Sequence, residues 1–293
     1  MSPTDRERLD RLDRMGQLLR SLVSSATPLR IPEGIKVPIE GSIAATQDRE
    51  WRAEHEDPLD RMITEALASG FRLLVAAEDR ILTISDVARR PERCFSALTL
   101  ARAAIEAVAH AFWLLDPSID GDSRAARAAH GLRDAAGAAH SFGNKTGLGF
   151  GEQAEQALQN LFEIAQEIGP VARPKWEALA RTLAAELGLG AHLSDSGFGV
   201  LVEAAHSGKN VRDSIAPDWT SEGIVAFSPH AITEWALWFL GNLYAAAMLR
   251  AGEFVGWPGL DNWLAQVVET LEGVQGLFNE VKMQHEEIEQ EEG

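Results

Sequence analysis

The stretch that decides the fold runs from Cys94 to Pro117 and reads CFSALTLARAAIEAVAHAFWLLDP. Its larger apolar side chains recur at alternating steps of three and four, the spacing that places side chains along one stripe of an α-helix. Alanine and leucine fill most of the other faces, and a helix that is apolar nearly all round usually lies at the centre of a protein. The stretch therefore predicts a buried helix that ends at Asp116, because a residue before proline disfavours the helical conformation.

A strip of four residues interrupts the apolar surface of this helix: Arg102, Glu106, His110 and Trp113. Since an isolated buried charge is costly, Arg102 and Glu106 should pair with each other or with groups on a neighbouring helix. Two interpretations stay open: a structural salt bridge beside a half-buried histidine, which is favoured, and one wall of a polar pocket. In the second case we expect a ligand pocket formed by Arg102, Glu106, His110 and His206.

The composition of the 293-residue chain excludes several classes of site. The formal net charge of −17, from 27 basic and 44 acidic residues, argues against a broad surface for nucleic acid. The single cysteine, Cys94, excludes an internal disulfide and a cysteine zinc site. Glu203 and His206 have the Glu-x-x-His spacing of di-iron bundles, but no second copy of that motif occurs. We expect no metal and no cofactor.

The location of the protein is inferred from two segments. The N-terminus carries charges at every turn and has no apolar core, so it does not read as a secretory signal. The longest uncharged apolar segment, Trp235 to Leu249, is 15 residues long and too short to span a bilayer. These features predict a soluble cytoplasmic protein that does not enter a membrane.

Helical periodicity extends over most of the chain and predicts an all-α multi-helix bundle. Four segments are expected: an amphipathic N-terminal helix at 1–25, a connector rich in Pro and Gly with a short helix at 26–56, a helical bundle domain at 57–283, and an acidic tail at 284–293. Within the bundle, helices are predicted at 57–88, 94–116, 122–142, 152–168, 174–187, 197–206, 229–253 and 260–288. Two of them, 94–116 and 231–252, are the expected central apolar helices.

The N-terminal helix presents a narrow apolar stripe on a surface that is otherwise rich in Asp and Arg. The stripe consists of Leu9, Leu12, Met15, Leu19 and Leu22. Such a helix needs a partner, which can be its own domain or a second subunit. The near-heptad spacing with alternating charges favours a second subunit.

One pair of residues suggests catalysis. Arg133 and His140 have the Arg-to-His spacing of RNA-cleaving helical domains of the HEPN type, in which the arginine would hold phosphate and the histidine would act as general acid or base. The same spacing occurs at 49–55 and 124–130, so the pattern by itself does not single out one pair. Arg133 and His140 are therefore weak catalytic candidates.

The order of these features resembles a family of uncharacterised all-helical actinobacterial proteins, which is itself distantly HEPN-like. The family carries Arg-x-x-x-Glu before Trp-Leu-Leu-x-Pro and later Tyr-x-x-x-Ser-x-x-x-His-Gly, and the match covers about Asp57 to Gly252. Arg102, Glu106 and His206 fit the two motifs. Three positions depart from the second motif: Phe198 stands for Tyr, Val202 for Ser, and Ser207 precedes Gly208. The resemblance implies a fold and no settled activity.

The function expected from the sequence is a non-catalytic interaction or regulatory protein that acts as a homo-oligomer or with a protein partner in a larger assembly. The absence of a specific catalytic motif and the amphipathic N-terminal helix favour it. The alternative is a HEPN-like RNA-cleaving enzyme or a small-ligand-binding protein with a polar pocket around Arg102, Glu106 and His206. An RNA enzyme would require the arginines at 89, 90, 93, 124, 127 and 133 to converge.

Overall fold

A computed structural model of the chain describes residues 3–30, 38–88, 90, 94–146, 152–189, 201 and 229–291. Every regular element in these ranges is helical, which confirms the predicted all-α multi-helix fold for the described part of the chain. The elements are α1 (Pro3–Arg30), α2 (Ile43–Glu54), the 3-10 turn η1 (Leu59–Arg61), α3 (Met62–Val87), α4 (Cys94–Leu114), α5 (Gly121–Thr146), α6 (Glu152–Ile168), α7 (Trp176–Glu186), α10 (Pro229–Val255) and α11 (Leu260–Glu291).

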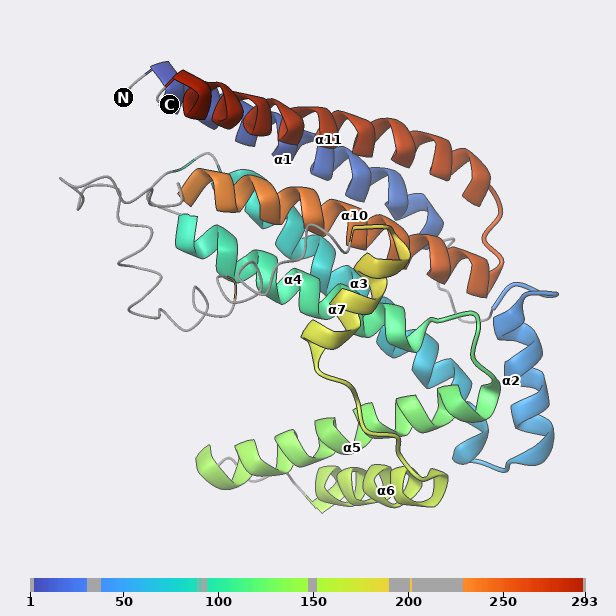
Figure 1. The fold of residues 1–293 in the computed structure, drawn as a ribbon. Coiled ribbons are helices and arrows are strands. Elements are labelled where there is room, and N and C mark those ends of the chain that lie inside the picture. The colour runs from blue at the N-terminus through green and yellow to red at the C-terminus, as the bar shows by residue number, and fades with distance from the viewer. Residues whose placement is uncertain are drawn as a thin grey trace.

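The helices form three layers (Figure 1). α1 and α11 lie side by side along one edge, α10, α4 and α3 form the middle, and α5 and α6 form the opposite edge. α7 crosses α4, and α2 stands at one end, where it contacts α10, α3 and α5. The layer of α5 and α6 is therefore separated from α1 and α11 by the whole middle layer.

α4, the helix of the decisive stretch, is buried against α3, α10 and α7. Leu98, Ile105 and Val108 on its apolar stripe are fully buried. Among the described helices one segment, Ser96–Leu114, is long and apolar enough to cross a membrane by length and composition. The bundle buries 72% of that window, so the hydropathy of α4 matches its place among the other helices.

α1 packs on its own chain, against α3, α10 and α11. Leu12, Met15 and Leu19 are fully buried there. Gly241 of α10 permits the close approach of α1, because a Cβ atom at this position would lie 2.7 Å from Leu19 Cδ2. Most of the apolar stripe of the N-terminal helix is thus covered within the chain and is not open to a second subunit.

Several element boundaries differ from those predicted. α1 continues to Arg30, so the first residues of the predicted connector are helical. α2 begins after Ser42, whose hydroxyl accepts a hydrogen bond from the Ala45 amide at 3.1 Å. α11 continues to Glu291, well into the segment expected as an acidic tail. The helix predicted at 197–206 lies outside the described residues except for Leu201, which is helical.

Asp120 takes the capping position at the start of α5. Its Oδ1 accepts a hydrogen bond from the Ser123 amide at 2.7 Å. The hydrogen bonds from Ser123 lower the pKa of this carboxyl group. The turn at 115–120 therefore ends one residue before α5 and leaves the end of α4 facing the first turns of α5.

Candidate functional site

The polar strip of α4 does not form the salt bridge considered for Arg102 and Glu106. No ion pair joins these two residues in the part of the chain that the structure describes. The Arg102 guanidinium instead lies 5.7 Å from the ring centroid of Trp176, at the start of α7. Its buried Nε has no hydrogen-bond partner among the described residues. His206, the fourth member of the expected pocket, lies outside those residues.

His110 lines a small cavity with residues that the sequence analysis did not connect to it. This cavity, here called the basic notch, has a volume of about 30 Å³. α3, α4 and α5 form its walls together with the segment that precedes α7. Its lining includes Ser69, Leu73, His110, Trp113, Arg127, Gly131 and Arg173. The notch therefore brings one imidazole and two guanidinium groups together.

The His110 imidazole is 7% exposed and has no hydrogen-bond partner among the described residues. Burial and, to a smaller extent, the positive charge of Arg173 together lower its pKa from 6.5 to about 4. His110 is therefore neutral at pH 7, with one nitrogen able to donate a hydrogen bond and one able to accept. His110 lines the notch, so its imidazole is available to a group held there.

Arg127 is half-buried and is held by the end of α4. Its guanidinium donates to the Trp113 carbonyl and lies 5.0 Å from the ring centroid of the same residue. Burial lowers the pKa of Arg127. The nearby charges of Asp116 and Asp120 oppose this decrease. No described carboxylate forms an ion pair with Arg127, and Asp116 pairs with Arg250 at 3.1 Å.

Arg173 belongs to the segment between α6 and α7, and its side chain is 36% exposed. Its Nη2 lies 3.5 Å from Asp134 Oδ2. The same carboxylate oxygen lies 3.1 Å from His130 Nδ1. Asp134 therefore lies close to His130 and Arg133 of α5 as well as to Arg173, and it forms no ion pair with Arg127.

Arg124 fills the corner between α4 and α5 and is fully buried. Its Nε donates to Gln47 Oε1 at 2.8 Å, and its two Nη atoms donate to the carbonyls of Leu114 and Asp116. Its guanidinium also lies 3.7 Å from the ring centroid of Phe254. These contacts occupy all three nitrogens, so Arg124 is unable to join Arg127 in a surface for phosphate.

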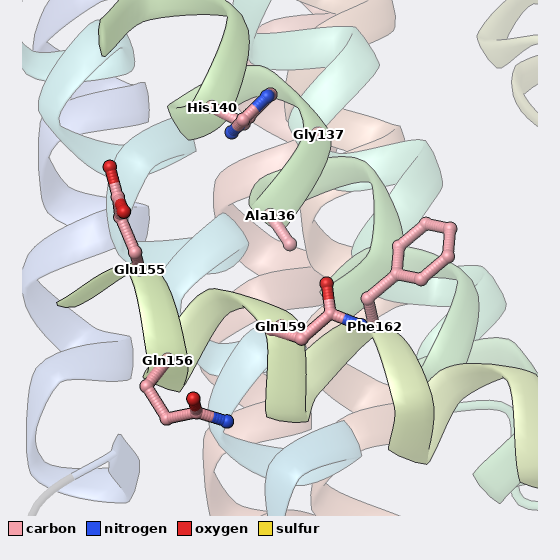
Figure 2. A pocket seen from close by; sticks show the side chains of 7 residues that line it. All are labelled: Ala136, Gly137, His140, Glu155, Gln156, Gln159 and Phe162. Atoms are coloured by element: carbon pink, nitrogen blue, oxygen red, sulfur yellow. The ribbon is translucent and has the colours of Figure 1, made fainter. Parts of the chain in front are cut away.

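A second and larger cavity lies between α5 and α6 and has a volume of about 660 Å³. Figure 2 shows this α5–α6 cleft, with Ala136, Gly137 and His140 on the α5 wall and residues of α6 on the other. The α6 wall consists of Glu155, Gln156, Gln159 and Phe162. The cleft is open and its polar side chains are exposed.

The candidate catalytic pair is only half present in this cleft. His140 lines it, whereas Arg133 is not among its described lining residues and has its Nη2 3.9 Å from Asp134 Oδ1. Of the other arginines that an RNA enzyme would bring together, Arg90 is exposed, and those at 89 and 93 lie outside the described residues. No group of three or more His, Cys, Asp or Glu side chains in the described ranges is placed to hold a metal ion.

The sequence predicts only part of the basic notch. His110 stood out as a polar residue on an apolar helix, but Arg127 and Arg173 come from α5 and from an irregular segment.

Comparison with known proteins adds no relative: no family model, no curated protein and no solved structure matches this chain. The resemblance to an all-helical actinobacterial family therefore stays a prediction.

Proposed function

We propose that the protein is a non-catalytic interaction protein that self-associates through the α5–α6 cleft. The observation that carries this proposal is the size and position of the cleft. Its volume of about 660 Å³ lies in the range of binding sites. Its two walls, α5 and α6, form an outer layer of the bundle (Figure 1). α1, which offered the first argument for self-association, is occupied by its own chain.

The cleft combines a projecting side chain with open space. Phe162 on the α6 wall is 37% exposed, although a large aromatic side chain gains most from burial. Ala136 and Gly137 form the opposite wall, and a Cβ atom at Gly137 would meet nothing within 4 Å. In a two-fold dimer each contact occurs twice, so each Phe162 would enter the cleft of the other copy.

The polar groups of the cleft support the same occupant. His140 on one wall can donate a hydrogen bond, and Glu155 on the other can accept one. A two-fold axis would match His140 of one copy with Glu155 of the second. A second copy of the chain therefore offers both an apolar group and complementary polar groups to this cleft.

The catalytic alternative has less support in this region. An RNA-cleaving site needs positive charge close to its histidine, and the described lining of the cleft contains Glu155 and no arginine or lysine. Arg133 is next to Asp134 instead.

Molar mass in solution tests the proposal. The full chain, of 31.9 kDa, is expected to approach twice that mass in light scattering as its concentration rises from low micromolar to several hundred micromolar. Phe162→Asp should shift this transition to higher concentration, because a carboxylate would enter an apolar contact. Val75→Asp on α3, which changes another exposed apolar residue, is the matched control and should dimerise like the wild type.

Two outcomes would contradict self-association through this surface. A wild-type mass of 31.9 kDa at every concentration would exclude it. Equal weakening by the Phe162 and Val75 substitutions would place the contact elsewhere.

A further inference from the structure

We propose that the basic notch binds one oxyanion group of a small molecule, of the phosphate type, between His110, Arg127 and Arg173. This site lies on a different set of α5 residues from the α5–α6 cleft, since the notch uses Arg127 and Gly131 and the cleft uses positions 136–140. The inference therefore does not depend on self-association.

The charge of the notch is the first argument. Arg127 is half-buried, contacts a neutral backbone carbonyl, and has no ion pair with a described carboxylate. Arg173 shares Asp134 with His130 and Arg133, so it does not hold that carboxylate alone. A guanidinium in a partly desolvated site attracts an anion more strongly than one in water.

The hydrogen-bonding groups of the notch indicate an acceptor-rich ligand. Arg127 and Arg173 carry only donors, and the neutral His110 adds a further donor. His110 is more than nine-tenths buried and lacks a hydrogen-bond partner among the described residues. Because the three donors come from three separate segments, they suit the several oxygens of a tetrahedral group better than the two coplanar oxygens of a carboxylate.

The shape of the notch limits how much of a ligand it can hold. About 30 Å³ admits a single small group and excludes a whole nucleotide. Gly131 and Arg173 are its exposed lining residues, whereas His110 and Trp113 are buried, so the mouth lies at the first pair and the floor at the second. The rest of the ligand would extend into solvent past Gly131.

Gly131 supplies a further indication that the mouth is open. It lies in the interior of α5, where glycine destabilises a helix by roughly 1 kcal/mol relative to alanine. A Cβ atom at this position would meet nothing within 4 Å, so no packing contact requires glycine. A larger side chain at position 131 would extend across the mouth of the notch.

Calorimetric titration of the full chain with inorganic phosphate at pH 7 and constant ionic strength tests the site, with sulfate and acetate in parallel. Phosphate and sulfate should bind and acetate should bind more weakly. Arg173→Gln should weaken phosphate binding about tenfold or more, because it removes a charge-assisted hydrogen bond from an exposed residue. Arg14→Gln, which removes an exposed charge from α1 on the far edge of the bundle, is the control and should leave binding unchanged.

The Gly131→Leu variant distinguishes an effect on phosphate binding from an effect on stability. This substitution should preserve or raise the melting temperature, because leucine is the better helix former, while it weakens phosphate binding by blocking the mouth. A wild-type chain that binds neither phosphate nor sulfate at tens of millimolar would overturn the proposal. Retention of wild-type affinity by both Arg173→Gln and Gly131→Leu would overturn it as well, whether the chain is a monomer or a dimer.

Discussion

Two regions of the molecule bury an arginine in different ways. At the contact of α1 with α10, Arg11 Nε lies 3.2 Å from Glu234 Oε1, and both residues are almost inaccessible. Arg11 Nη2 and Glu234 Oε2 have no hydrogen-bond partner among the described residues. At the corner of α4 and α5, Arg124 donates to three oxygens without an ion pair to a described carboxylate. The comparison shows that hydrogen bonds to uncharged oxygens satisfy all three nitrogens of the buried Arg124, whereas the ion pair of Arg11 leaves one of its nitrogens without a partner among the described residues.

The end of α4 explains why the corner accommodates a cation. The last carbonyls of an α-helix have no partner within the helix and carry the negative end of its dipole. Arg124 donates to the carbonyl of Leu114, the last residue of α4, and to that of Asp116, two residues beyond the end of the helix. Burial still lowers the pKa of Arg124 to about 9, so the residue remains charged at pH 7. At the α1 contact, burial raises the pKa of Glu234 and the charge of Arg11 opposes that rise.

The largest loss of stability is expected from Arg124→Met. It should lower the free energy of unfolding by about 4–5 kcal/mol, because it leaves two carbonyls and the Gln47 amide oxygen without their donor in a buried site. Urea unfolding followed by circular dichroism measures this change. Arg124→Lys keeps the charge but not the fork of donors and should recover less than half of the loss. A loss below about 1 kcal/mol for the methionine variant would contradict the role assigned to the corner.

A smaller loss, and a different pattern, is expected at the α1 contact. Arg11→Met alone should cost about 3–4 kcal/mol because it leaves the buried Glu234 carboxylate without its cation. Arg11→Met combined with Glu234→Leu should lie within about 1 kcal/mol of the wild type, since a buried ion pair seldom stabilises more than apolar packing. The same unfolding assay applies. Additive losses in the double variant would show that this ion pair stabilises the fold as effectively as the corner does.

The smallest of the three effects depends on pH. His110 has a pKa of about 4 in the folded chain and an ordinary value of 6.5, so between these values the unfolded chain binds more protons. Stability should therefore fall as the pH decreases from 6.5 to about 4, by at most about 3 kcal/mol from this residue. His110→Gln should flatten this part of the stability curve. Parallel curves for the two proteins would show that His110 does not resist protonation.

The helices were accessible from the sequence because their signals are local. Apolar residues at steps of three and four mark α4, and the same rule marks α6, whose predicted range of 152–168 agrees with the structure. The local sequence does not show which surface covers an apolar stripe. The spacing of Leu12, Met15 and Leu19 is the same whether the stripe meets a second subunit or, as found, α3, α10 and α11.

For a similar reason, the sequence predicts only some of the residues of the basic notch and of the Arg124 corner. His110 was selected because a polar residue on a buried helix is costly, and this reasoning is independent of the fold. Its neighbour Arg173 lies 63 positions later in an irregular segment, without any periodic signal. The partners of Arg124 include backbone carbonyls, which every residue possesses, so residue identities alone do not indicate where that arginine binds.

The position of α1 also has a consequence for how the chain folds as it is synthesised. α1 is synthesised before the helices that cover it, and part of its apolar stripe can be covered by α3 soon afterwards. α10 and α11 follow much later in the chain, and Glu234 follows Arg11 by 223 residues. At about 5–20 residues per second, the ribosome takes about 10–45 s to supply the partner of Arg11. During that interval the nascent chain exposes apolar surface of α1, which makes this helix a natural binding site for chaperones before the last two helices arrive.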